Sequence, residues 1–452
     1  MCMERDARIL ITKDGIDNDF GFIKDFKKEK GLNEPTKLSC PLFQTPDGNS
    51  SEEYFEKICQ KGLKEKFGAE IPKTVSERYE KEKSVIFKLG YTEKFLHYKT
   101  LAEWAKANNI FLSVDRGSAV GSLVCYLLDL TKINPLKYNL IFERFINTER
   151  FFSNPSIEFD VEAGKKEEVV EHIIKTFGAE NCALTAEYSY PFIFKSDKEN
   201  IALKTFIYVS NEPVKNKVAL GKLDQKTYIS AEPERIFEKS NCLKFVIQPA
   251  EYPECFKQAG NDLFSEPMND PNIYSLIADN EINREFMSCE SEKDAKEYYK
   301  KINPQNIEDL ASVYTLLRES VIFSGITDDF IKTKSSDTKE YYCEALKPVL
   351  KDTYGVIIWQ EQVIEILNII LEFGFDKSDE IRRSLAKQQI SPKLKTSFIN
   401  SAQKLGMSRQ KAKLLWNKTE KAVPYCFMKS HAISGALMAY YATYCFREGI
   451  NG

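Results

Sequence analysis

The stretch SIEFDVE, residues 156–162, constrains the fold more than any other, because polar and apolar residues alternate along it without a break. On a β-strand, successive side chains point to opposite faces of the sheet. The alternation therefore predicts a strand that carries Glu158, Asp160 and Glu162 on one face and apolar side chains on the other. Such a row of carboxylates can bind metal ions, or it can be a solvated face, and the alternation alone leaves both interpretations open.

Length and composition indicate the class of protein. The chain has 452 residues, of which 42% are hydrophobic and 29% charged, as is typical of a soluble globular protein with two or three domains. No apolar run is long enough to cross a bilayer, and the first residues are too charged for a signal peptide, so we expect no membrane association. The eleven cysteines contain no CxxC pair, which indicates reduced thiols and a cytoplasmic location.

The number of histidines and the net charge limit the kinds of site that the chain can contain. Three histidines in the whole chain argue against a metal centre built from several histidines. The net charge of −3 carries no global sign of nucleic-acid binding, so any such site must come from local patches.

The residue patterns predict three regions. Residues 1–50 are expected to form an irregular arm, 51–260 an α+β domain and 261–452 a helical domain. Residues 51–68 begin at a serine and end at a glycine, which are typical limits of a helix. Residues 164–178 have the spacing of an amphipathic helix, and residues 183–250 are rich in the β-branched and aromatic residues of strands. The fold class predicted is therefore α+β, with an all-α last third.

The segment DRGSAVGS, residues 115–122, comes between a predicted strand and a predicted helix. Backbone N–H groups at the start of a helix attract phosphate, and hydroxyl and guanidinium groups add to that attraction. Arg116, Gly117, Ser118 and Ser122 are therefore candidate phosphate ligands. A turn of small residues that permits tight packing is the alternative, and the spacing matches neither a Walker motif nor a Rossmann motif.

The region from Ile381 to Lys429 contains twelve lysines and arginines and a single acidic residue, Glu420. Arg383 and Lys387 are spaced to lie one helical turn apart, facing the same side. This composition predicts a polyanionic partner, either nucleic acid or nucleotide phosphates, although a solvated basic face is the alternative. Farther on, Lys429 and His431 begin a helix and are further candidates for phosphate contacts.

Several long motifs together resemble one family. RGSAVGSLVCYLLDLTKINPLKYNLIFERFINTER, TYGVIIWQEQVIEI, IRRSLAKQQ and FMKSHAISGALMAYYATY are similar to motifs of the bacterial C-family replicative polymerase, the DNA polymerase III alpha subunit. The resemblance extends, with gaps, from about residue 41 to the last residues. It implies a nucleotidyltransferase-like palm of mixed β-sheet and helices, followed by an all-α fingers domain.

The resemblance also implies roles for individual residues. Gly117 and Ser118 would contact the triphosphate of the incoming nucleotide, and Arg144 would lie at the rim of the active site. From the fingers, Arg382, Arg383 and Lys387 would contact the same phosphates. Lys429, Ser430 and His431 would belong to the nucleotide-facing helix of the fingers.

In this family, carboxylates on one strand and a further aspartate on a neighbouring strand bind two Mg²⁺ ions that assist phosphoryl transfer. Two alignments of the acidic strand are possible. If Pro155 is the anchor, Ser156 replaces the first aspartate, Glu158 the second, and Asp160 follows as an auxiliary ligand. If the acidic string itself is the anchor, Glu158 and Asp160 form the catalytic and metal-binding pair.

Other parts depart further from the family pattern. The strand NCLKFVIQPAEY places Val246 where the neighbouring-strand aspartate is expected. The metal-dependent PHP domain is expected to be absent, and the long helical thumb is expected to be reduced to a β-rich insert at about 187–240. We therefore expect a palm and fingers with a weakened Mg²⁺ site.

Three functions remain open. The first is a protein with little or no polymerase activity that retains nucleotide or DNA binding in an accessory or regulatory role. The second is an active but divergent polymerase or nucleotidyltransferase that uses Glu158, Asp160 and Glu162 as a shifted metal cluster. The third is a structural or protein-binding role. The first two imply a DNA primer–template and deoxynucleoside triphosphates as partners, with replication proteins possible and the oligomeric state unknown.

Overall fold

The computed structural model describes residues 39–150, 154–155, 157–162, 164–187, 204–214, 220–222, 228–230, 237, 240–250, 254–259, 264, 267–277, 292–389 and 391–449. Most of the predicted arm, the serine at 156 and most of the β-rich insert predicted at 187–240 lie outside this range. None of the helices within it is long and apolar enough to cross a membrane.

The chain divides into two compact units, and each is made of separate stretches of sequence. The first unit contains the described residues up to Val114, together with Leu127–Thr131 and Arg150–Tyr252. The second contains Asp115–Tyr126, Lys132–Glu149 and Pro253–Gly452. Two short stretches from the interval 51–260 thus group with the helices of the C-terminal half. Helix α6 (Leu123–Leu127) spans one of the points where the chain passes between units.

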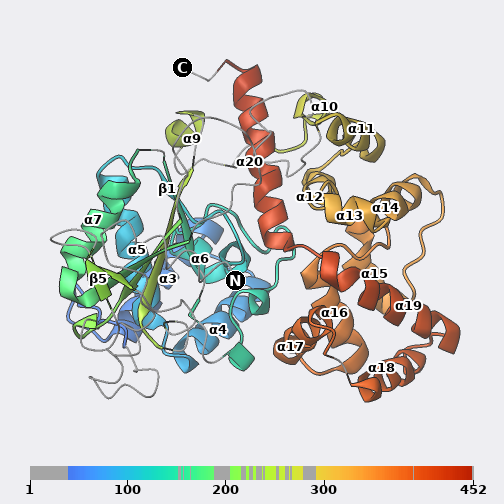
Figure 1. Ribbon diagram of the computed structural model, residues 1–452, viewed down its shortest axis with the longest axis horizontal. Coiled ribbons are helices and arrows are strands. Elements are labelled where there is room, and N and C mark those ends of the chain that lie inside the picture. The colour runs from blue at the N-terminus through green and yellow to red at the C-terminus, as the bar shows by residue number, and fades with distance from the viewer. Residues whose placement is uncertain are drawn as a thin grey trace. The chain divides into compact units, whose positions relative to one another are not determined.

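The first unit is α+β, as the sequence predicts (Figure 1). Its strands form a seven-stranded mixed sheet, counted over the described residues, in the order β1-β2-β7-β4-β3-β6-β5. The strands are β1 (Leu112–Ser113), β2 (Glu158–Glu162), β3 (Cys182–Glu187), β4 (Lys204–Val209), β5 (Leu220–Lys222), β6 (Tyr228–Ser230) and β7 (Leu243–Ala250). Strands β2 and β7 are parallel neighbours, and so are β3 and β6, whereas the other pairs are antiparallel.

Aromatic side chains attach helices to this sheet. The helices of the first unit include α3 (Ser51–Phe67), α4 (Lys73–Lys88), α5 (Thr92–Ala107) and α7 (Lys166–Phe177), and aromatic contacts join α5 and α7 to the sheet. The ring of Tyr98 from α5 contacts Phe159 and Phe245, with centroids 5.8 and 5.5 Å away. Phe177 from α7 lies 6.0 Å from Phe245. Since Phe159 and Phe245 come from the adjacent strands β2 and β7, α5 and α7 pack on one face of the sheet.

Helix α3 begins at Ser51 and ends before Gly68, close to the predicted limits, but its capping serine is Ser50, one residue before the serine predicted. Ser50 and Glu53 form a reciprocal capping box at its start, and Gly68 ends it with φ = 82°. Capping residues satisfy backbone N–H groups that have no partner inside the helix, and a glycine adopts positive φ without steric cost. The helix expected at 164–178 is also confirmed, with Val169 and Ile173 buried.

Replacing Gly62 of α3 is expected to destabilise the first unit. A Cβ atom at this position would overlap the backbone carbonyl group of Leu127, approaching its carbon to 3.0 Å. Because a backbone carbonyl cannot rotate away as a side chain does, we expect Gly62→Ala to cost about 1–3 kcal/mol of unfolding free energy. Urea unfolding followed by the fluorescence of Trp104, which stacks on His172 within this unit at 3.7 Å, measures it. Lys61→Ala, at an exposed neighbouring position, is the control, and an equal effect of both changes would contradict the prediction.

The second unit is helical in the described residues. Its helices are α9 (Glu254–Ala259), α10 (Pro271–Ile277), α11 (Glu292–Ile302), α12 (Ile307–Leu316), α13 (Glu319–Phe323), α14 (Ile326–Ser335), α15 (Lys347–Leu350), α16 (Gln360–Leu371), α17 (Phe375–Ala386), α18 (Pro392–Lys404), α19 (Arg409–Ala422) and α20 (Lys429–Arg447). Helix α20, the long red helix in Figure 1, packs against α9, α10 and α12. Gly435 permits this approach, since a Cβ there would lie 2.9 Å from the ring of Tyr314 on α12. The all-α last third expected from the sequence is confirmed.

Candidate functional site

The predicted acidic row lies on strand β2 of the first unit. The side chains of Glu158, Asp160 and Glu162 share one face because their positions alternate along the strand. Asp160 is fully buried, Glu162 is 8% exposed and Glu158 is half-buried. Phe159, on the opposite face, packs against the aromatic side chains beneath the sheet. The row is therefore not the solvated face that the sequence left open as an alternative.

The neighbouring strands set what surrounds these carboxylates. In the parallel pairing of β2 with β7, Glu158 lies opposite Val246 and Asp160 opposite Gln248. From the other side, β1 places Ser113 opposite Asp160. Val246 is 1% exposed and belongs to an apolar cluster with Phe206, Tyr208 and Phe237, among others. Strand β7 thus lies directly beside the acidic strand, but none of these paired positions contributes a second carboxylate.

This donor set does not fit a pair of metal ions held by carboxylates from two strands. Within the described part of the chain, no group of three or more His, Cys, Asp or Glu residues is arranged to hold a metal ion. Valine offers no donor atom, and the glutamine opposite Asp160 offers a neutral amide rather than a charge. No reaction step is therefore assigned to a metal ion here.

The turn predicted to contact phosphate belongs to the second unit. Gly117 has φ = 72°, a backbone conformation that favours glycine. A Cβ atom there would meet no atom within 4 Å, so a steric clash is not the reason for the glycine. Helix α20 holds the turn: the Ser430 hydroxyl donates to the Gly117 carbonyl oxygen at 2.9 Å, and the Ser434 hydroxyl donates to that of Asp115. The structure thus brings Gly117 and Ser118 next to the first turns of α20.

A buried glutamate caps the start of α20. The Glu361 carboxylate, 1% exposed, accepts hydrogen bonds from the backbone N–H groups of Lys429 at 2.8 Å and Ser430 at 3.3 Å. A carboxylate at a helix N-terminus is favoured both by these hydrogen bonds and by the helix dipole. The sequence patterns above did not identify Glu361, although a charged residue within the apolar run WQEQVIEI is a signal of a buried polar contact.

Lys429 is the cation of this region. Its side chain is buried, its ammonium nitrogen lies 4.9 Å from the centre of the Trp359 ring, and the Asp352 carboxylate is 3.9 Å away. An aromatic face and a carboxylate both attract an ammonium group. Lys429 therefore provides a positive charge close to the α20 start and the Gly117 turn.

Glu365, one turn after Glu361 on α16, makes the stability of this region depend on pH. Burial raises the pKa of Glu365 to about 7, and while Lys429 lowers it, the Glu361 and Asp352 carboxylates raise it. The folded state binds the Glu365 proton more tightly than the unfolded chain does, so this proton stabilises the fold. Its contribution to the free energy of unfolding is fully present below about pH 4.5 and is lost as pH rises through about 7.

We expect Glu365→Gln to remove that pH dependence. Between these two pKa values the free energy of unfolding should fall with pH by up to roughly 1.4 kcal/mol per pH unit in the original chain, and less in the variant. Urea unfolding at a series of pH values measures the difference. Glu372→Gln, at the exposed end of the same helix, is the matched control and should leave the slope unchanged.

Arg144 is linked to the same helix start. Its Nε donates to the Gln360 side-chain oxygen at 2.7 Å, and the Gln360 amide nitrogen donates to the Cys426 carbonyl oxygen at 3.3 Å. The Gln360 backbone N–H also donates to the Phe427 carbonyl oxygen at 2.8 Å. Gln360 thereby fixes the arginine relative to the segment that leads into α20.

A single buried carboxylate holds the arginines of α17. Asp379, fully buried, accepts from Arg382 Nε at 2.9 Å and lies 2.8 Å from Arg382 Nη2. Its second oxygen lies 3.4 Å from Arg383 Nε and accepts from the Asn147 amide at 3.1 Å. Two guanidinium groups therefore share one negative charge. Lys387, the first residue after α17, is exposed.

His431 occupies an aromatic niche. Its Nε2 lies 3.3 Å from the Tyr314 hydroxyl, and its ring lies 5.2 Å from that of Phe427. This environment is typical of a histidine that packs between helices. Arg116 and Ser122 lie on the turn itself, half-buried and buried respectively.

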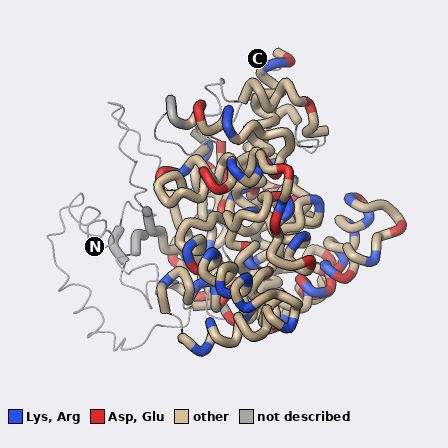
Figure 2. The backbone as a smooth tube through the Cα atoms, turned by 90° about the vertical axis from the view of Figure 1, so that its right-hand side faces the viewer, with Lys and Arg blue, Asp and Glu red and all other residues tan. Residues whose placement is uncertain are grey.

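The sequence-predicted phosphate ligands thus gather mainly in one unit. Gly117, Arg144 and Lys429 are connected through α16 and α20, and α17 packs against the segment of Arg144. Basic and acidic positions are otherwise interspersed along the described backbone (Figure 2). The acidic row belongs to the other unit.

Comparison with known families matches two parts of the chain. Residues 53–202 match the model of the bacterial DNA polymerase III alpha NTPase domain, and residues 251–406 match that of the bacterial DNA polymerase III alpha subunit finger domain.

Curated relatives span most of the chain. The DNA polymerase III subunit alpha of Aquifex aeolicus is 27% identical over 89% of this chain and 43% of its own length. That of Buchnera aphidicola (subspecies Schizaphis graminum) is 28% identical over 86% and 41%, and that of Escherichia coli K12 is 27% identical over 88% and 42%. The chain spans less than half the length of these relatives.

Proposed function

The chain belongs to the bacterial DNA polymerase III alpha-subunit family as a divergent, partial member, and from this premise we propose that it binds nucleotides and primer–template DNA but synthesises little or no DNA. Its role would then be accessory or regulatory. The basic side chains of the second unit carry the binding, and the altered acidic strand of the first unit limits the chemistry.

The pairing of β2 with β7 is the observation that carries this proposal. Nucleotidyl transfer in the family depends on metal ions held by carboxylates. Beside Glu158 and Asp160, strand β7 supplies Val246 and Gln248, neither of which is charged. Loss of preorganised charge at a phosphoryl-transfer site costs several kcal/mol of transition-state stabilisation. The proposed loss of synthesis follows from that missing charge.

The binding half of the proposal rests on the second unit. Phosphate groups would meet the Gly117 turn together with the guanidinium and ammonium groups of Arg144, Arg383 and Lys429. Attraction between such cations and a polyanion does not require catalytic carboxylates, so binding persists where synthesis is lost. Glu361 and Ser430, which hold the start of α20 and the Gly117 turn, are buried and hydrogen-bonded, and the half-buried Gln360 holds Arg144; these contacts favour a preorganised site.

A second candidate function is an active divergent polymerase. It is favoured by one observation, that three carboxylates share one face of β2 and that Glu158 at its start is half-buried rather than enclosed. A shifted metal cluster of Glu158, Asp160 and Glu162 would then replace the arrangement of the family, and it requires these side chains to rearrange, since no three such residues in the described part of the chain are arranged to hold an ion. A purely structural role is the third possibility and predicts neither binding nor synthesis.

Primer extension with Mg²⁺ or Mn²⁺ separates the first two functions. We expect no extension above that of the Glu158→Ala/Asp160→Ala double variant. Extension that the double variant abolishes would support the active polymerase and overturn the proposal.

Salt-dependent binding to a primer–template tests the proposed DNA binding. Replacing Arg383 and Lys387 by alanine should weaken binding and lower the salt slope by up to roughly 0.9 for each phosphate that these side chains neutralise. Lys64→Ala/Lys300→Ala, at exposed positions of α3 and α11 outside the basic region 381–429, removes the same charge and serves as the control. Absence of binding by the original chain at low salt would leave only the structural role.

A further inference from the structure

The second unit contains a cavity of about 360 Å³ that the predicted phosphate site does not use. It lies between α14, residues 336–342, residues 354–357 and helix α19, and its lining includes Lys332, Lys339, Tyr342, Leu414, Lys418 and Lys421. None of the residues assigned to nucleotide binding above lines this cavity. Its volume falls in the range of small-molecule sites, roughly 300–1,000 Å³.

The charge of the cavity is positive. Four lysines line it against two carboxylates, those of Asp329 and Glu340. One carboxylate is already engaged, since Lys418 Nζ lies 2.7 Å from Asp329. Lys332 and Lys421 are exposed and form no ion pair with any residue that the structure describes. Two exposed ammonium groups of the lining are therefore available to an anion.

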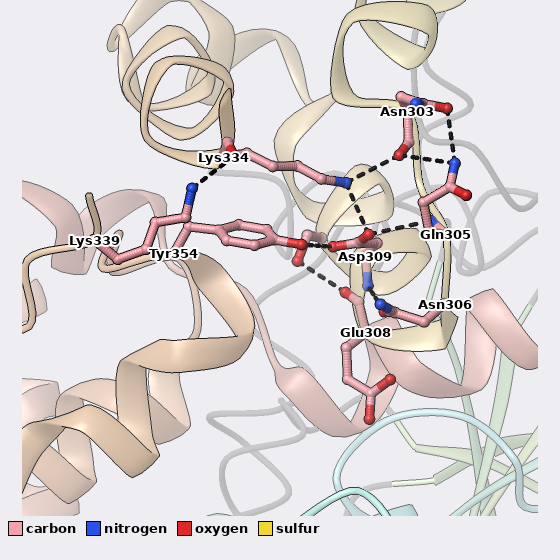
Figure 3. A network of polar contacts seen from close by, with 9 residues as sticks. Asn303, Gln305, Asn306, Glu308, Asp309, Lys334, Lys339 and Tyr354 are labelled. Atoms are coloured by element: carbon pink, nitrogen blue, oxygen red, sulfur yellow. Dashed lines mark hydrogen bonds and ion pairs between the residues drawn. The ribbon is translucent and has the colours of Figure 1, made fainter. Parts of the chain in front are cut away.

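Two residues that line the cavity, Lys339 and Tyr354, belong to a polar network (Figure 3). The Tyr354 hydroxyl donates to Asp309 at 2.7 Å, and Lys334 Nζ donates to the other oxygen of that carboxylate at 2.8 Å. Lys339 Nζ donates to the backbone carbonyls of Thr333 and Lys334, each at 2.8 Å, at the end of α14. These contacts order the side chains of Lys339 and Tyr354 before any ligand binds, which lowers the entropy cost of binding.

Apolar and aromatic groups complete the lining. Leu414 is 49% exposed although it is a large apolar residue, and Tyr342 is half-buried. A site that binds inorganic anions alone gains nothing from such groups, whereas a nucleotide presents a flat base next to its phosphate. Basic and aromatic side chains in one cavity therefore favour a nucleotide over a simple anion.

We propose that this cavity is a second anion site, which binds a nucleotide phosphate through Lys332 and Lys421 and packs the attached base against Tyr342 and Leu414. The ligand is either a free nucleotide or one nucleotide unit of a single strand, because both present the same phosphate and base. The site is independent of the polymerase reaction and requires no metal ion.

The test compares two double variants of the full chain. Lys332→Glu/Lys421→Glu reverses the charges of the two lysines proposed to bind phosphate, and Lys300→Glu/Lys413→Glu makes the same change in net charge at exposed lysines of α11 and α19 outside the cavity. Binding of a labelled oligothymidylate is measured by fluorescence anisotropy over a range of salt. We expect the cavity variant to bind at least about tenfold more weakly, with the salt slope reduced by roughly 0.7, the contribution of one phosphate contact on a single strand. Equal loss in both variants, or no loss in the cavity variant, would overturn the proposal.

Calorimetry with small ligands distinguishes the two possible occupants of the site, a free nucleotide and one nucleotide unit of a single strand. Binding of thymidine monophosphate that the cavity variant loses identifies a free nucleotide, and binding of the oligothymidylate alone identifies a strand; both support the site. Tyr342→Ala should weaken either ligand while leaving inorganic triphosphate unaffected. If inorganic triphosphate binds as tightly as the nucleotide, or if Tyr342→Ala has no effect, a nucleotide site is excluded. Unchanged fluorescence of Trp359 and Trp416, both buried in this unit, verifies that each variant is folded.

Discussion

Asp379→Ala is expected to destabilise the second unit by about 3–5 kcal/mol and to weaken DNA binding with it. The reason is that Asp379 is fully buried and holds Arg382, Arg383 and Asn147 at once. Removing one partner from a buried ion pair leaves the other charge without compensation, and that cost exceeds the loss of the attraction itself. Arg382, a residue of α17 that is only 7% exposed, would then carry an uncompensated charge.

Urea unfolding of a Trp104→Phe background measures this effect. Of the three tryptophans, Trp359 and Trp416 belong to the second unit, so the remaining fluorescence reports that unit alone. Glu380→Ala, which removes a surface carboxylate paired with Lys377 on the same helix, is the matched control and should cost no more than about 1 kcal/mol. Adding Arg382→Ala to Asp379→Ala should recover part of the stability. A double variant as unstable as the sum of both single variants would argue against the shared ion pair.

Val246→Asp is expected to unfold the first unit at neutral pH and to restore no DNA synthesis. In the family, an aspartate at this point of the neighbouring strand would complete the carboxylate set, so the substitution is the obvious repair. In this chain, however, Val246 is 1% exposed among aromatic side chains, of which Tyr208 and Phe237 stack at 4.2 Å. The ammonium group of Lys244 already lies over the rings of Phe206 and Tyr208, 4.8 and 5.7 Å from their centres. Burying an ionised carboxylate among these rings costs several kcal/mol.

The pH dependence identifies the charge as the cause. Burial would raise the pKa of the introduced carboxyl, so its destabilising effect should grow as pH rises above about 4, the ordinary value for aspartate. Val246→Asn introduces a similar shape without the charge and should show no such pH dependence. Trp104 fluorescence monitors this unit. A folded Val246→Asp variant that extends a primer with Mg²⁺ would contradict the prediction and would favour an active enzyme.

Local sequence patterns predicted the elements well. Alternation in SIEFDVE identified strand β2 and the shared face of Glu158 and Asp160, because strand periodicity depends on adjacent residues alone. The limits of α3 were likewise visible in its capping residues. The pairing of Asp379 with Arg382 could also be predicted, since residues three apart on a helix are neighbours. The burial of the pair could not, because the same local sequence occurs in ion pairs at a protein surface.

Long-range contacts were not predictable in this way. Glu361 caps a helix that begins 68 residues later in the chain, and no local periodicity marks such a partner. The burial of Asp160 and Glu162 depends on β1 and β7, which come from distant parts of the sequence. The resemblance to the polymerase family supplied the position of Val246 beside the acidic strand, which the residues themselves did not indicate.

The discontinuous make-up of the two units has a consequence for dissecting this protein. A gene fragment that encodes residues 253–452 would omit Asp115–Tyr126 and Lys132–Glu149, which belong to the second unit. The hydroxyls of Ser430 and Ser434 would lose their carbonyl acceptors, Gln360 would lose Arg144, and Asp379 would lose Asn147. A cut at any single peptide bond therefore severs at least one unit. Functional halves would have to be obtained by grafting the two short stretches through linkers, or by complementation between co-expressed fragments.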